Sequence, residues 1–152
     1  MAKQLKRAYN FGTVSHATMR PEDLIPAFLD ELRSGPLKRE HRKTATEIAH
    51  RLGKRKYWDS GDVEWDLEAL FDLLDVYAAP YFYFGAHPGD GSDYGYWLVE
   101  DFHQDFDGLK VSDLNEIPAD YVGEVCHVND HGNTTLYIRS RNGRLRELWG
   151  LV

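Results

Sequence analysis

Residues 81–98 read YFYFGAHPGDGSDYGYWL, and at this stretch the character of the chain changes. Helix-like patterns precede it, whereas after it aromatic and β-branched runs are interrupted by Gly, Asn and Asp, a texture typical of strands separated by turns. The two aromatic runs predict strands over 81–85 and 94–98, and the glycine-rich residues between them predict a long connecting loop. The sequence therefore predicts helices first and a sheet afterwards.

One strand and three helices are expected before this stretch. In PEDLIPAFLDEL, Pro21 suits the first helical position and the acids after it suit the positive end of the helix dipole. Pro26 lies far enough into the helix to predict a kink or a short first turn. Asp62 is the expected N-cap of the third helix. The strand is expected over 9–19, with a bend at Gly12. The helices are expected from Pro21 onward, over about 37–52 with Gly53 as C-cap, and over about 63–78.

The C-terminal third predicts an antiparallel meander. NDHGN at 129–133 and RNGR at 141–144 are hairpin signals, because Asn and Gly tolerate the positive φ of tight turns. The expected elements are a short helix near 99–106 and strands over 122–128, 133–139 and 145–151. The predicted fold class is α+β, with the N-terminal helices packed on one face of a mostly antiparallel sheet and a C-terminal β-meander. A chain of 152 residues fits one globular domain over 1–152.

Composition excludes several classes of protein. Hydrophobic residues make up 42% and aromatic residues 13%, which argues against disorder. No apolar run approaches the roughly 20 residues needed to cross a bilayer, and no apolar stretch follows the basic residues of MAKQLKRAYNFG, so neither a membrane partner nor a secretory signal is expected. Cys126 is the only cysteine, so no internal disulfide can form; VCHV around it favours a buried strand residue over a nucleophile.

Charge is strongly segregated along the chain. The net charge is -7, yet residues 37–56 carry +6, residues 57–130 carry one Lys against 18 acids, and residues 131–152 carry +3. Within the acidic block, four carboxylates recur on one face of the third helix, opposite its apolar face. They are Glu64, Glu68, Asp72 and Asp75.

This acidic surface has three interpretations. It is a solvated helix face, or a surface that mimics nucleic acid or docks on a basic partner protein, or a cation-binding face. TATEIAHRLG followed by VEWDLEALFDLL and a hairpin also suggests a winged helix-turn-helix. The connection between those helices is too long for that motif, and the carboxylates would face DNA phosphates, so direct nucleic-acid binding is not expected.

Two polar segments are the candidate ligand- or partner-binding sites. GAHPGDGSDYG lacks the P-loop pattern, the dinucleotide fingerprint and the acids of a calcium loop, but it combines acceptors, a titratable ring and aromatic faces. HVNDHGN is the second segment, for which turn chemistry is the main alternative. The candidate residues are His87, Asp90, Asp93, Tyr94, Tyr96 and Trp97 in the first segment, and His127, Asn129 and Asp130 in the second.

A metal site built from His16, His87, His127 and nearby aspartates is a further hypothesis, since metal ligands can come from distant segments. HExxH is absent and Ser15 lacks a GxSxG context, so no catalytic residue is assigned. No metal and no cofactor is expected.

Several stretches together resemble a widespread family of small uncharacterised proteins of phage and prophage genomes. These stretches are GTVSHATMRPEDLIPAFLDEL, WDLEALFDLLDVYAAPYFYFGAHPGDGSDYGYWL, FDGLKV and GEVCHVNDHGNTTLY with RLRELW. The resemblance covers most of the chain and is weakest in residues 36–58. The family has no established activity. The resemblance implies a phage accessory protein in the host cytoplasm that alters the host.

We therefore expect a non-enzymatic binding protein that acts by occlusion, for example an inhibitor of a host defence or regulatory protein. Either the acidic region 57–107 meets a basic partner surface, or loop 85–97 holds a small polar, nucleotide-like ligand between Tyr94, Tyr96 and Trp97. The negative charge of such a ligand would need arginines from elsewhere, such as Arg139, Arg141 or Arg144, or from a neighbouring subunit. A metal-dependent hydrolase or nuclease using His87, Asp90, Asp93 and His127 is the alternative. A structural or virion-associated module is a third.

Overall fold

The computed structural model describes residues 6–152. It contains helices and two sheets, so the predicted α+β class is confirmed. The sequence predicts a single domain, whereas the contacts group into two compact units, Met1–Val99 and Glu100–Val152, each described by itself below. Among residues 6–152, no helix combines the length and the apolar character needed to cross a membrane.

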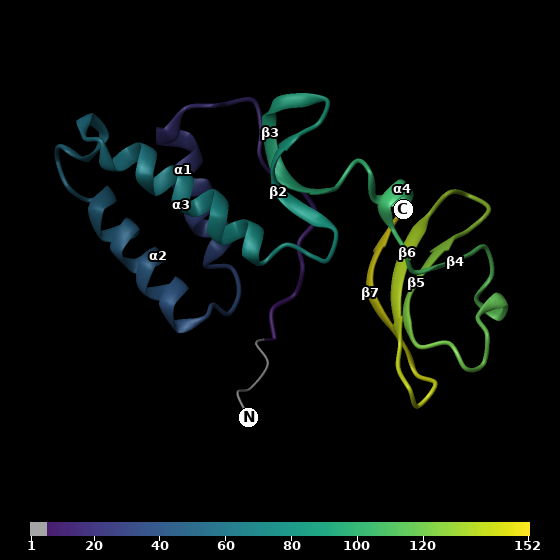
Figure 1. Ribbon diagram of the computed structural model, residues 1–152. Coiled ribbons are helices and arrows are strands. Elements are labelled where there is room, and N and C mark those ends of the chain that lie inside the picture. Colours follow the sequence, from purple (N-terminus) through teal and green to yellow (C-terminus); the bar gives the residue numbers. More distant parts are fainter. Residues whose placement is uncertain (1–5) are drawn as a thin grey trace. The chain divides into compact units, whose positions relative to one another are not determined.

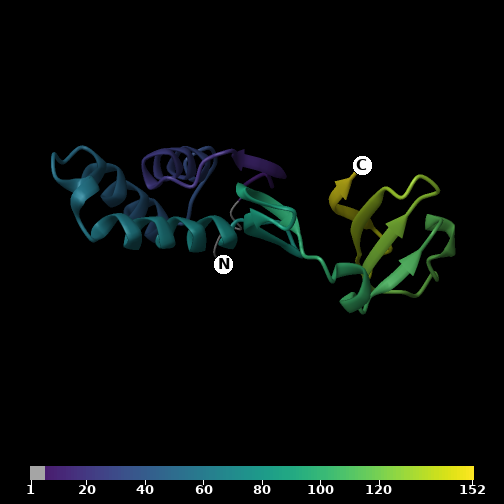
Figure 2. The ribbon, with the colours of Figure 1, turned by 90° about the horizontal axis from the view of Figure 1, so that it is seen from above.

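The N-terminal unit packs helices against a three-stranded sheet. The sheet is antiparallel, in the order β1-β3-β2. Helices α1 and α3 contact each other, and α3 leads into the β2–β3 hairpin (Figures 1 and 2). The elements are β1 (Gly12–Ser15), α1 (Pro21–Leu32), α2 (Arg39–Leu52), the 3-10 helix η1 (Tyr57–Asp59), α3 (Asp62–Val76), β2 (Phe82–His87) and β3 (Asp90–Leu98).

The core of this unit forms where α1 and α3 meet the sheet. Leu24, Phe28 and Leu32 follow helical spacing along α1 and are each at most 1% exposed. The Phe28 ring lies at the centre, edge-on to Phe71 and Phe84 with ring centroids 5.0 Å away in both cases. Burial of this apolar stripe stabilises α1, because an isolated helix of its length is marginal in water.

The ends of the elements differ from the sequence prediction in several places. Pro21 occupies the start of α1 as expected, but α1 continues through Pro26 to Leu32. Gly61 takes the N-cap position of α3, and Asp62 is already helical. Gly53, by contrast, is the C-cap of α2 as predicted, with φ -78°. The strand predicted over 9–19 shortens to Gly12–Ser15, because only these residues pair with β3.

The prediction of a long loop after β2 is wrong. Pro88 and Gly89 alone form the turn, since Asp90 already pairs with His87 and opens β3. One glycine in this stretch, Gly95, serves close backbone packing instead. Gly95 pairs with Thr13 of β1 on one side and with Gly85 of β2 on the other, in the central strand.

Gly95→Ala is expected to loosen β1. The added Cβ would lie 2.0 Å from the Gly12 carbonyl oxygen, so the backbone of β1 must shift. Backbone shifts forced by overpacking cost about 2 kcal/mol of unfolding free energy. Gly91→Ala in the same strand is the matched control, because nothing lies within 4 Å of its Cβ position. Equal urea midpoints for the two variants would contradict the prediction.

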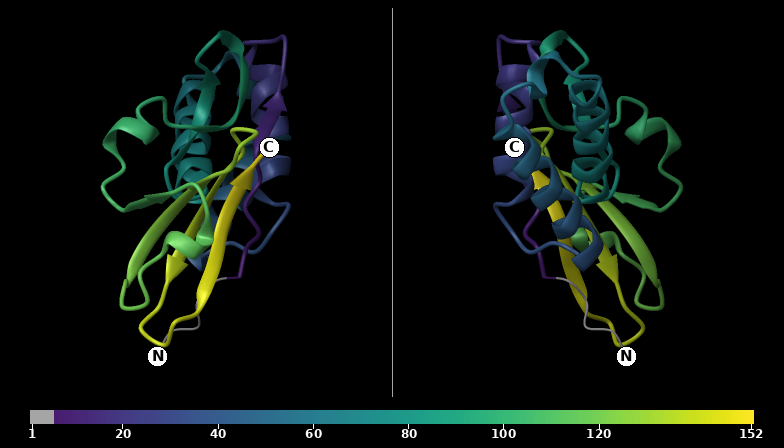
Figure 3. Two further views of the ribbon diagram at one scale, coloured as in Figure 1. Left: turned by 90° about the vertical axis from the view of Figure 1, so that its right-hand side faces the viewer. Right: turned by 90° about the vertical axis from the view of Figure 1, so that its left-hand side faces the viewer.

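The C-terminal unit is a four-stranded sheet in the order β4-β5-β6-β7. Strands β5, β6 and β7 form the predicted antiparallel meander (Figure 3). Strand β4 pairs in parallel with β5 and was missed, since three residues carry no recognisable alternation. The elements are α4 (Phe102–Asp105), β4 (Leu109–Val111), the 3-10 helix η2 (Leu114–Glu116), β5 (Gly123–Val128), β6 (Thr134–Arg139) and β7 (Leu145–Leu151).

Cys126 lies in the core of this unit. Its side chain is 1% exposed, opposite Leu136 of β6, and burial raises the pKa of its thiol. A thiol with a raised pKa carries little thiolate at neutral pH. The predicted assignment as a buried strand residue is confirmed.

Candidate functional site

The four predicted carboxylates of α3 are all exposed. Trp65 lies beside them with 73% of its surface exposed, the largest exposed aromatic side chain among residues 6–152. We define the acidic face of α3 as Glu64, Trp65, Glu68 and Asp72. Trp65 was missed at the sequence level because a Trp in a helix is expected to be buried. Its position next to Glu64, outside the apolar spacing of 63, 67, 70 and 74, was the available signal.

Asp75, the last residue of the predicted stripe, has a structural contact. Its Oδ1 accepts a hydrogen bond of 2.9 Å from the backbone N–H of Phe84. Strand β2 is an edge of the sheet, so this contact satisfies a donor that no neighbouring strand can reach. We therefore leave Asp75 out of the acidic face.

A buried carboxylate lies on the opposite side of α3. Asp66 is 5% exposed and receives a bidentate pair from Arg51 of α2, with Nε to Oδ2 at 2.9 Å and Nη2 to Oδ1 at 2.6 Å. The hydroxyl of Tyr57 donates to Oδ2 at 2.8 Å. Burial, followed by the bond to Asp66, raises the pKa of the Tyr57 phenol, and the same carboxylate raises the pKa of Arg51. Arg51, Tyr57 and Asp66 form a triad that joins α2, η1 and α3. These contacts hold α3, the helix that presents the acidic face, in place.

The aromatic residues predicted to bind a ligand do not share one surface. Tyr94 and Tyr96 are 8% and 2% exposed and belong to the core of the N-terminal unit. Burial and the neighbouring Glu31 raise the pKa of Tyr96. Only Trp97 lies at the surface among the three, half-buried, with its indole Nε1 donating to the Gly85 carbonyl at 3.0 Å. The predicted clamp of three rings is wrong, because strand alternation turns Tyr94 and Tyr96 to the core side.

The polar residues at the hairpin tip mainly stabilise the turn. His87 Nδ1 accepts from the Gly89 N–H at 2.9 Å, and Asp90 Oδ1 accepts from the Ser92 N–H at 3.0 Å. The hydrogen bonds from the backbone N–H and from the side chain of Ser92 lower the pKa of Asp90. His16, whose Nε2 lies 3.7 Å from Asp90 Oδ2, makes a smaller contribution. Asp93 Oδ1 is shielded and has no hydrogen-bond partner within the described chain.

The second predicted segment is a turn. Asn129 Oδ1 accepts from the backbone N–H groups of His131 and Asn133 at 2.9 and 3.0 Å, which is Asx-turn chemistry. Asp130 is exposed at the tip of this turn. His127 Nε2 lies 3.1 Å from the Ser112 carbonyl oxygen.

The proposed metal ligands do not gather within either unit. His16 and His87 belong to the N-terminal unit and His127 to the C-terminal unit. Across residues 6–152, no group of three or more His, Cys, Asp or Glu side chains is placed to hold a metal ion.

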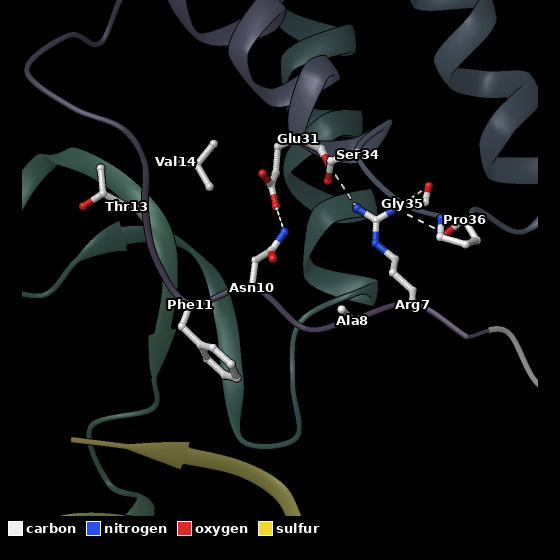
Figure 4. A pocket seen from close by; sticks show the side chains of 10 residues that line it. All are labelled: Arg7, Ala8, Asn10, Phe11, Thr13, Val14, Glu31, Ser34, Gly35 and Pro36. Atoms are coloured by element: carbon white, nitrogen blue, oxygen red, sulfur yellow. Dashed lines mark hydrogen bonds between the residues drawn. The ribbon is translucent and has the colours of Figure 1, made fainter.

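A pocket of about 530 Å³ lies between the segment before β1 and the end of α1 (Figure 4). The Arg7 guanidinium donates to the carbonyls of Glu31, Leu32 and Gly35 at 2.7–3.0 Å, which satisfies the C-terminal end of α1. Asn10 Nδ2 donates to Glu31 Oε1 at 2.5 Å. Both charged side chains of the pocket thus have partners within the protein, Arg7 in backbone carbonyls and Glu31 in the Asn10 amide, and the pocket serves to anchor the N-terminal segment.

Comparison of the chain with protein-family models, curated proteins and solved structures found no match.

Proposed function

We propose that the protein is a non-enzymatic, phage-type accessory protein that binds a basic surface of a host protein and blocks it. The observation that carries this proposal is the exposure of Trp65 among the carboxylates of the acidic face. A defence or regulatory protein that binds nucleic acid would offer the complementary basic surface.

The composition of the acidic face suits protein recognition. Tryptophan is enriched among the residues that contribute most to binding, and surrounding polar residues exclude water from it. Glu64, Glu68 and Asp72 would speed association with a basic partner through long-range attraction.

The alternatives have weaker support. A ligand held in the hairpin would need Tyr94 and Tyr96, which are buried in the core. A hydrolase would need His87 and Asp90 free to act, yet both accept hydrogen bonds from their own turn. No specific observation favours a virion-associated module.

The test is capture of a partner from host lysate, followed by titration of the purified partner. Trp65→Ala is expected to weaken the affinity about 30-fold, the loss typical of a central interface residue. Glu64→Gln/Glu68→Gln/Asp72→Asn is expected to slow association and to flatten its salt dependence.

The matched control is Glu100→Gln/Asp107→Asn/Asp120→Asn, which makes the same charge change at exposed positions of the other unit. It should bind like the wild type. A partner whose affinity is insensitive to salt and to Trp65→Ala would refute docking through the acidic face.

A further inference from the structure

A groove lined by four arginines lies on the C-terminal unit. It has a volume of about 470 Å³ and is built around the turn that joins β6 to β7. The Asn142 side chain accepts from the Arg144 N–H at 3.0 Å, and Gly143 has φ 83°, so the tight turn brings both strand ends together. We define the arginine groove by its lining residues, which are Val122, Gly123, Ile138, Arg139, Ser140, Arg141, Arg144 and Arg146.

The lining of this groove carries four positively charged side chains. The described residues that line it include no carboxylate. Within residues 6–152, the salt bridges involve other cations: His16, Arg20, His41 and Arg51. Four guanidinium groups around one groove repel one another, so an anion bound between them would lower that repulsion.

Arg139 provides a second, independent observation. Its Nε is shielded from solvent and has no hydrogen-bond partner in the described part of the chain. A shielded donor without a partner costs free energy, and for a charged group this cost is larger than for a neutral one. Rotation of the Arg139 side chain toward the groove would let an oxygen atom of a ligand accept from this nitrogen, which would remove that cost. The guanidinium fork suits phosphate and carboxylate oxygens, which it can bind in a bidentate manner.

The surroundings favour a small ligand over a polymer. The groove volume lies within the range of small-molecule sites. The whole chain has a net charge of -7, which would repel the phosphates of a nucleic acid that extend beyond the groove. Val122, 52% exposed, and Ile138 add an apolar wall, against which a flat ring could lie.

From these observations we propose that the arginine groove binds a small phosphate-bearing ligand of nucleotide size. The phosphates lie among Arg139, Arg141, Arg144 and Arg146, with one oxygen accepting from Arg139 Nε once that side chain has turned into the groove. The apolar part of the ligand lies against Val122 and Ile138. This binding is independent of the acidic face, because all lining residues belong to the C-terminal unit.

The test is calorimetric titration of the full chain with ATP and with pyrophosphate. We expect saturable one-to-one binding that weakens as salt is raised. Arg141→Gln/Arg144→Gln removes two exposed cations and is expected to weaken binding at least tenfold, the loss expected for a hydrogen bond to a charged group. Arg139→Lys keeps the charge but loses the fork, so it is expected to weaken binding while the fold is retained, as checked by circular dichroism.

Arg39→Gln/Arg42→Gln on α2 is the matched control and should bind ATP like the wild type, as should Trp65→Ala. The proposal is overturned if neither ATP nor pyrophosphate binds, or if Arg141→Gln/Arg144→Gln binds like this control. It is also overturned if single-stranded oligonucleotides bind more tightly than ATP, with affinity that rises with length, because that result identifies a nucleic-acid surface.

Discussion

Phe28→Ala is expected to lower the unfolding free energy of the N-terminal unit by about 4 kcal/mol, within the range for removal of a buried aromatic ring. The side chain is fully buried, and its ring contacts Phe71, Phe84 and Tyr94 edge-on, which joins α1 to α3 and to both strands of the hairpin. None of these rings can fill the space without leaving its own contacts. The loss therefore combines apolar transfer, the cavity and the ring–ring contacts.

The measurement is urea unfolding followed by far-ultraviolet circular dichroism, because α1, α2 and α3 all belong to this unit. Phe11→Ala is the matched control. Phe11 is 41% exposed and contacts Phe82 edge-on, so its removal is expected to cost about 1 kcal/mol. If Phe28→Ala shifted the midpoint no further than Phe11→Ala, the proposed centre of the core would be wrong.

Asp66→Ala is expected to destabilise the same unit by about 3 kcal/mol. Breaking a buried ion pair costs about 3–5 kcal/mol, because the remaining partner keeps its desolvation penalty without compensation. The Arg51 side chain is 31% exposed and can regain some water, which sets the expectation at the lower end. The Tyr57 hydroxyl also loses its acceptor.

Controls separate the triad from a general loss of charge on α3. Glu68→Ala removes an exposed carboxylate from the same helix and is expected to change the unfolding free energy by no more than about 0.5 kcal/mol. Tyr57→Phe removes one hydrogen bond and is expected to cost about 1 kcal/mol. In a double-mutant cycle, Arg51→Ala and Asp66→Ala are expected to be non-additive. Additive effects of these two substitutions would rule out the coupling that the geometry implies.

Asp66 shows that the sequence carries a signal for a buried ion pair. It lies on the apolar spacing of α3, three residues after Val63 and four before Leu70. A charged residue in such a stripe requires a partner, since burial of an unpaired charge is costly. The partner itself could not be identified from spacing, because Arg51 lies 15 residues away on a different helix. Only the packing of α2 on α3 brings the two together.

In the hairpin around residue 88, by contrast, the local sequence does not reveal the role of the key residue. The sequence predicts loop residues at the glycines of this hairpin, because glycine tolerates turn conformations. In the structure Gly95 is a strand residue, required because the Gly12 carbonyl of β1 lies where a Cβ would be. This close approach depends on the pairing of β1 with β3, which joins segments about 80 residues apart. No local signal distinguishes that glycine from a turn glycine.

The sequence by itself determined the order of helices and strands apart from β4, the C-terminal meander, the burial of Cys126 and the carboxylate face of α3. These features depend on periodicity and turn chemistry, which act between residues close in the chain. The tertiary structure alone decided that Tyr94 and Tyr96 are buried while Trp65 is exposed, that Asp66 has a partner, and that four arginines line one groove. These features depend on which elements pack together, and the free energy of that packing comes from contacts between residues far apart in the sequence.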